Sequence, residues 1–144
     1  MTSVLIVLTA ARSWSLKDGT QRPTGFWADE FAEPHRTLST AGVRLTIATP
    51  GGRTPVVDEG SLTPQAAGSV EKAAELRSYL DSVTDLRSPV RLEDIDPDDY
   101  HGVFIPGGHV APYVVPAILA MAEAQDASGK DLILGLALGN EIEM

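Results

Sequence analysis

The segment Tyr100–His109, YHGVFIPGGH, decides the fold prediction. Its apolar run, Gly102–Ile105, breaks at a Pro-Gly-Gly turn that places a histidine directly after the expected strand. In open α/β folds, ligands bind in the crevice beyond the carboxyl ends of parallel strands. We therefore expect a binding or catalytic site at this turn, with backbone N–H donors from Gly107 and Gly108 and a side-chain role for His109.

The rest of the chain alternates in the same way between expected strands and helices. Continuous β-branched and apolar runs predict buried strands, and amphipathic spacing predicts the helices between them. This alternation predicts a single α/β domain over residues 1–144, with a mainly parallel sheet and helices on both faces. The expected strands are Ser3–Thr9, Val43–Ala48, Gly102–Ile105 and Leu132–Leu138, with a possible short strand at Thr54–Val57; the expected helices are Gly25–Ala41, Gln65–Val83 and Val114–Gln125.

Local signals refine two of these segments. Trp14–Pro23 is polar and contains an Asp-Gly turn signal, which favours a loop. Thr24 is a candidate cap for the first helix, Pro34 should kink it or tighten a turn, and Gly42 should end it.

Composition limits the function classes. The formal net charge is −9, which disfavours nucleic acid and anionic membranes as partners. No apolar run approaches the ~20 residues of a membrane span, and no positive region precedes the first apolar strand, so we expect a cytoplasmic protein. The sequence contains no cysteine, and its three histidines lack metal-ligand spacing, so we expect neither a metal nor a cofactor.

Four segments carry a resemblance to a known family: SVLIVLTA at the start, WSLKDG at Trp14–Gly19, PTGFWADEFAEP, and ATPGG at Ala48–Gly52. Together with FIPGGH, they make residues 1–109 resemble the DJ-1/PfpI superfamily (class I glutamine amidotransferase-like), in particular its glyoxalase III-like branch. The resemblance implies a three-layer, flavodoxin-like sandwich. It also implies catalysis through a cysteine, which this sequence does not contain.

Beyond His109 the resemblance fades. Relatives continue the turn as GGHG, whereas Val110 follows here, and they then reach a cysteine in a motif like CHGP. The nearest counterpart is LGLALGN, which puts Leu136 or Ala137 at the position of the missing nucleophile. Only four residues follow Asn140, so we expect a domain without the usual C-terminal part. Either a homodimer partner covers the last strand, or the chain is a shortened or divergent version of a longer ancestor.

The resemblance assigns a catalytic role to Glu30, whereas the position of His109 after the strand and the Gly-Gly turn suits it to hydrogen-bond a substrate carbonyl or to orient a catalytic group. The resemblance implies that Glu30 is partly buried among aromatic neighbours and serves as a general acid/base. Without the resemblance, the simpler interpretation is that Glu30 lies on a solvent-exposed helix face and that His109 hydrogen-bonds to the backbone of its loop. Trp14 and Trp27 are candidates for lining a substrate pocket, although a packed loop anchor is the simpler interpretation of Trp14.

Two functions remain open. Relatives convert methylglyoxal to lactate through a thiohemiacetal, a covalent step that a chain without a thiol cannot perform. The first function is therefore a cofactor-independent lyase, isomerase or hydratase that acts on a small carbonyl compound through Glu30. The second is a pseudoenzyme whose fold serves ligand binding, chaperoning or assembly.

Overall fold

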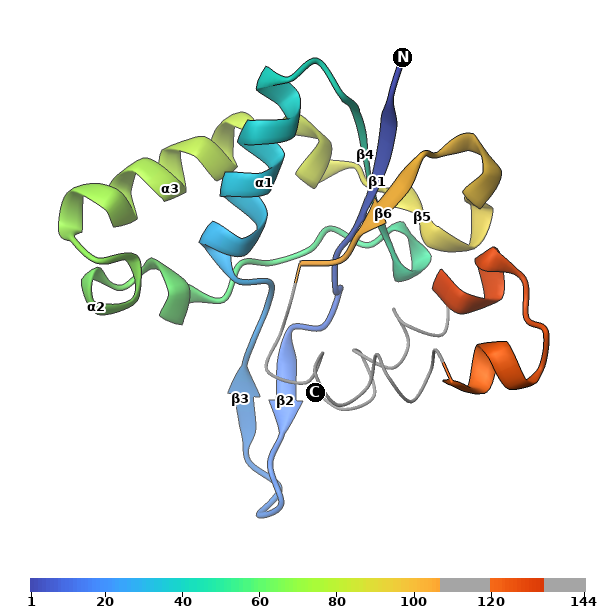
Figure 1. Ribbon diagram of the computed structural model, residues 1–144. Coiled ribbons are helices and arrows are strands. Elements are labelled where there is room, and N and C mark those ends of the chain that lie inside the picture. Colours follow the sequence, from blue (N-terminus) through green and yellow to red (C-terminus); the bar gives the residue numbers. More distant parts are fainter. Residues whose placement is uncertain (107–119, 134–144) are drawn as a thin grey trace.

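The computed structural model describes residues 1–106 and 120–133. Within this part of the chain, one sheet has the strand order β5-β4-β1-β6, and all neighbouring strands run parallel (Figure 1). This arrangement confirms the predicted α/β fold with a mainly parallel sheet. The strands are β1 (Ser3–Val7), β4 (Arg44–Thr49), β5 (Val90–Arg91) and β6 (Gly102–Phe104); the helices are α1 (Ala28–Thr40), α2 (Pro64–Ala67) and α3 (Val70–Ser82).

Strand β1 lies at the centre of the molecule and is buried on both faces. Its successive side chains alternate between two hydrophobic clusters, as the pleat of a strand requires. Ile6 and Leu8 belong to the cluster that includes residues of α1 and α3, whereas Leu5 and Val7 belong to the cluster on the other face. Leu92, Ile95 and Ile133 complete this second cluster. The sheet is therefore covered on both sides, giving three layers (Figure 1).

Helix α1 begins three residues later than the sequence predicted. The chain is still extended at Phe26, whose N–H donates to the Val56 carbonyl at 2.9 Å and whose own carbonyl accepts the Asp58 N–H at 2.8 Å. This bridge leaves no room beside Gly25, where an added Cβ would lie 2.2 Å from the Val56 oxygen. The possible strand at Thr54–Val57 is thus reduced to a single parallel bridge between Phe26 and Val57.

The end of α1 matches the prediction. Gly42 has φ +75° and donates to the Ser39 carbonyl, while Val43 donates to the Leu38 carbonyl. These two hydrogen bonds are those of a Schellman motif, which places glycine in the left-handed conformation after a helix. Pro34 lies inside α1, which remains one continuous helix over its 13 residues.

The segment expected to be a loop at Trp14–Pro23 forms an antiparallel hairpin instead. Its strands are β2 (Ser13–Ser15) and β3 (Gln21–Pro23), and it projects from the body of the molecule (Figure 1). The predicted Asp-Gly turn is confirmed, because Gly19 has φ +82° and donates to the Leu16 carbonyl at 2.9 Å.

The predicted helix Gln65–Val83 is divided at a glycine. Gly68, with φ +95°, divides the expected helix Gln65–Val83 into α2 and α3, and Ser69 caps α3 by accepting the Lys72 N–H. Residues 120–124 and 129–133 are helical. The strand expected at Leu132–Leu138 is therefore wrong at its first two residues, and the remainder lies outside the described residues. Ser128 and Asp131 hydrogen-bond reciprocally at the start of the second helical segment, which makes Ser128 its cap.

Short 3₁₀ turns connect these elements, and three of them lie between α3 and β6. None of the helices in the described ranges has the length and hydropathy that crossing a lipid bilayer requires. The turns are η1 (Pro50–Gly52), η2 (Glu59–Leu62), η3 (Thr84–Arg87), η4 (Leu92–Asp94) and η5 (Pro97–Asp99).

Candidate functional site

The strand order reverses between β1 and β6. The chain passes from β1 outward to β4 and β5, and then returns to pair β6 with the opposite side of β1. Such a reversal opens a crevice at the carboxyl ends of the two strands, which is where open α/β sheets bind ligands. These ends are Val7 of β1 and Phe104 of β6, and the sequence predicts a site directly after β6.

Five of the predicted site residues lie outside the described part of the chain. Gly107, Gly108 and His109 follow the end of β6 by three to five residues. Leu136 and Ala137, the positions assigned to the missing nucleophile, are also outside it. Their roles stay predictions, as does the metal-free character of the complete site. Among the described residues, no group of His, Asp or Glu could hold a metal ion.

Helix α1 brings Glu30 to the carboxyl edge of the sheet. The C-terminus of α1 leads directly into the start of β4, so α1 runs antiparallel to the strands and its first turn lies at their carboxyl ends. Asp29 and Glu30 both occupy that first turn.

Glu30 is exposed, which corrects the expectation of a partly buried carboxylate. The aromatic residues expected to surround it point into the core, where Phe26 is 5% and Phe31 0% exposed. Their rings make an edge-to-face contact with centroids 5.4 Å apart. The buried stripe of α1 consists of Ala28, Phe31 and Ala32, and at about 100° of turn per residue Glu30 lies outside that stripe.

The two tryptophans are both half-buried, and they lie on different elements. Trp27 is the N-cap residue of α1 and accepts the Phe31 N–H through its carbonyl at 3.3 Å. Trp14 lies on β2, opposite Arg22 of β3. Trp27 therefore lies beside Glu30 at the start of α1, whereas Trp14 belongs to the projecting hairpin.

Sequence reasoning missed the residue that fixes the first turn of α1. Ser61 is 2% exposed, accepts the Ala28 N–H at 3.0 Å, and donates to the Asp58 carbonyl at 2.6 Å. A hydroxyl from η2 thus replaces the side-chain cap that Trp27 cannot provide. A buried serine 33 residues away in sequence gives no local signal, and only the bridge between Phe26 and Val57 brings it near.

The remaining two histidines have structural roles. His35 approaches the Tyr79 hydroxyl at 2.9 Å and stacks on Phe31 at 5.0 Å, and burial lowers the pKa of its imidazole. The His101 Nδ1 accepts the Ser3 N–H at 3.3 Å, near the amino end of β1. Both contacts lie away from the carboxyl ends of β1 and β6.

Comparison with known proteins identifies the fold. No family model matches the sequence, and no curated protein matches it either. The structure is similar to that of glyoxalase III from Candida albicans, with 20% identity, a TM-score of 0.60, and coverage of 94% of this chain and 51% of that chain. It is also similar to the Rapid Encystment Protein of 24 kDa from Francisella tularensis, with 16% identity, a TM-score of 0.56, and coverage of 86% and 55%.

These similarities confirm the predicted DJ-1/PfpI-type, flavodoxin-like fold. At this level of identity they establish the fold alone. The chain spans about half the length of these two solved structures.

Proposed function

We propose that the chain acts on a small carbonyl compound without a cofactor, with Glu30 as the group that removes and returns a proton. The observation that carries the proposal is the position of Glu30 in the first turn of α1, at the carboxyl edge of the sheet, which is also the edge that holds the topological switch point. The similarity of the fold to glyoxalase III supports a carbonyl substrate.

The chemistry follows from what these 144 residues contain. They include no thiol, so no thiohemiacetal forms on the chain. A carboxylate instead removes a proton from the carbon next to a carbonyl, and the electron pair moves onto the carbonyl oxygen as an enolate. We assign the stabilisation of that negative charge to the Gly107 and Gly108 N–H groups and to His109. Return of the proton to a different atom gives an isomerisation. Lyase or hydratase steps would use the same carboxylate and the same hydrogen-bond donors.

The exposure of Glu30 determines which role it takes first. A general acid needs a protonated carboxyl group, which an apolar environment would favour. Glu30 is exposed in the first turn of α1 and lacks that apolar environment, which suits it to act as a base. We therefore assign proton removal to Glu30, and proton return to the carboxyl group thus formed. Trp27 and Trp14 are assigned to the substrate-binding surface.

A pseudoenzyme is the second candidate. Two features favour a pseudoenzyme. The resemblance implies catalysis through a cysteine and a partly buried glutamate, whereas this sequence contains no cysteine and Glu30 is exposed. In that case the crevice serves ligand binding, chaperoning or assembly. For either function we propose a cytoplasmic homodimer that binds a small-molecule ligand. We propose no nucleic acid or membrane partner, because the net charge of −9 disfavours binding to both.

Consumption of methylglyoxal by the purified chain tests the proposal. Glu30→Gln should lower kcat/KM by about 100-fold or more, because a general base contributes typically 10²- to 10⁴-fold. His109→Ala should lower kcat without abolishing binding.

Asp29→Asn is the matched control, since it removes the same charge from the same helical turn and should keep wild-type turnover. Equal loss in Asp29→Asn and Glu30→Gln would contradict a specific role for Glu30. Absence of turnover in the wild type would exclude glyoxalase activity and favour the pseudoenzyme.

A further inference from the structure

The β2–β3 hairpin with its flanks, residues 12–23, forms an arm that is exposed along almost its whole length. Every residue of this arm is exposed except Trp14, which is half-buried. Hydrogen bonds within the arm maintain its shape, among them Leu16 N–H to the Thr20 carbonyl at 2.8 Å and Gln21 to the Ser15 hydroxyl at 2.7 Å. A two-stranded hairpin without further packing is only marginally stable in water. This arm therefore gains from a surface to pack against.

The charge of the arm is opposite to that of the whole chain. It carries Arg12, Lys17 and Arg22 against a single carboxylate, Asp18, whereas the chain has a net charge of −9. Arg12 reaches the Thr54 carbonyl at 3.4 Å. Within the described residues, neither Lys17 nor Arg22 forms an ion pair. The exposed part of the arm thus presents two cations and the 39% exposed Leu16.

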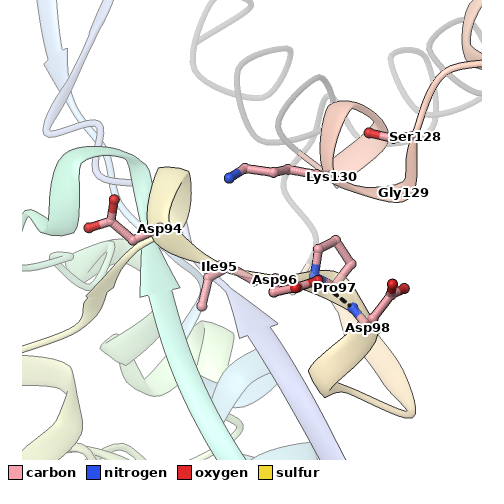
Figure 2. Close-up of a pocket in the computed structure, with 8 residues that line it drawn as sticks. All are labelled: Asp94, Ile95, Asp96, Pro97, Asp98, Ser128, Gly129 and Lys130. Atoms are coloured by element: carbon pink, nitrogen blue, oxygen red, sulfur yellow. Dashed lines mark hydrogen bonds between the residues drawn. The ribbon is translucent and has the colours of Figure 1, made fainter.

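A complementary groove lies between the turns η4 and η5 and residues 128–130. Figure 2 shows this acidic groove, a cavity of about 320 Å³ lined by Asp94, Asp96 and Asp98, with Ile95 and Pro97 between them. The segment 93–99 carries five carboxylates and no cation. Lys130 lines the groove on its other side, and Arg91 lies 3.9 Å from Asp94, so carboxylates outnumber the cations around it.

The arm does not fill the acidic groove of its own chain. In Figure 1 it projects downward from the body, whereas η4, η5 and residues 129–133 lie at the right of the sheet. Only a second molecule can bring an arm to this groove. In a two-fold dimer, each chain would offer both its arm and its groove, which gives the same contact twice.

We propose that two copies of this chain pair by placing the cationic β2–β3 arm of each in the acidic groove of the other. Lys17 and Arg22 face the carboxylates of Asp94 and Asp98, and Leu16 contacts the apolar strip at Pro97. The inference rests on the proposed homodimer but not on the proposed carbonyl chemistry. Opposite charges across such an interface set partner choice and association rate, and salt weakens them.

Sedimentation velocity with two charge-reversed variants tests the pairing. Lys17→Glu/Arg22→Glu reverses the arm, and Asp94→Lys/Asp98→Lys reverses the groove. Each variant alone should dissociate at least tenfold more readily than the wild type, and their equimolar mixture should recover the dimer, because both arm–groove contacts are then again of opposite charge. Circular dichroism verifies that each variant is folded.

The groove variant also controls for general repulsion, since it lowers the net negative charge and yet should lose the dimer. A wild-type chain that is monomeric at all concentrations would overturn both the homodimer and the arm–groove pairing. A wild-type dimer that both variants retain, or that the mixture does not restore, would overturn the pairing alone. Neither result bears on turnover of a carbonyl substrate, which is measured separately.

Discussion

At the scale of single residues, Gly25 is where the backbone before α1 has least space. An added Cβ would lie 2.2 Å from the Val56 oxygen and 2.8 Å from the Asp58 nitrogen. Gly25→Ala should lower the free energy of unfolding by about 1–3 kcal/mol, because the extended backbone must move apart. Gly102→Ala is the matched control, since no atom lies within 4 Å of the Cβ added there. Urea denaturation of both variants measures the effect, and equal stabilities would contradict the steric explanation.

Glu93 joins the turn after β4 to η4. Its two carboxylate oxygens accept the Gly51 N–H at 2.9 and 3.1 Å. Hydrogen bonds from its own backbone N–H and from Gly51, together with nearby Arg91 and Arg53, lower the pKa of this carboxyl group, although desolvation opposes them. The ionised Glu93 carboxylate therefore stabilises the folded chain fully above the unfolded-state pKa of about 4.3. This stabilisation is lost as the pH falls through the lower pKa of the folded state.

The expected result is a Glu93→Gln variant that is less stable than the wild type by about 1 kcal/mol at pH 7, with the difference shrinking as the pH falls below about 4. Urea denaturation across this range measures it. A difference that stays constant with pH would show that the charge of Glu93 contributes nothing.

At the scale of elements, the first turn of α1 depends on a hydroxyl from η2. Ser61→Ala would leave the buried Ala28 N–H without its acceptor, which should cost about 1–3 kcal/mol. Ser82→Ala removes an exposed hydroxyl bonded to its own helix and should change stability by a few tenths of a kcal/mol. Thermal unfolding distinguishes the two, and a Ser61 variant as stable as the Ser82 variant would contradict the capping role.

Elements with strong periodicity were predictable from the sequence. The strands around β1 and the end of α1 at Gly42 followed from buried apolar runs and from the left-handed conformation that glycine adopts. The start of α1 and the β2–β3 hairpin were not, because tertiary contacts decide both. Gly25 is held extended by Val56, and the polar hairpin has no alternating apolar pattern. Leu132 and Ile133 read as strand residues, yet the cap at Ser128 starts a helix there.

At the scale of the whole molecule, the sequence predicted where a site should lie but not the environment of its residues. The expected strand Gly102–Ile105 contains β6, which pairs with β1 at the switch point, and the Gly-Gly turn after it lies outside the described residues. The prediction that Glu30 is partly buried was wrong, because the neighbouring residues Phe26 and Phe31 pack in the core between α1 and the sheet and do not form a pocket around Glu30. The face of α1 that packs on the core consists of Ala28, Phe31 and Ala32, and Glu30 lies outside it. Spacing alone does not decide how deeply a residue beside the core is buried.

The central claim is that Glu30 removes a proton from a carbon next to a carbonyl. Proton NMR of methylglyoxal in D₂O measures this step directly, as exchange of the methyl protons, whether or not product forms. The account predicts exchange faster than in buffer for the wild type and Asp29→Asn, and exchange at the buffer rate for Glu30→Gln. Wild-type exchange at the buffer rate, or undiminished exchange in Glu30→Gln, would contradict it.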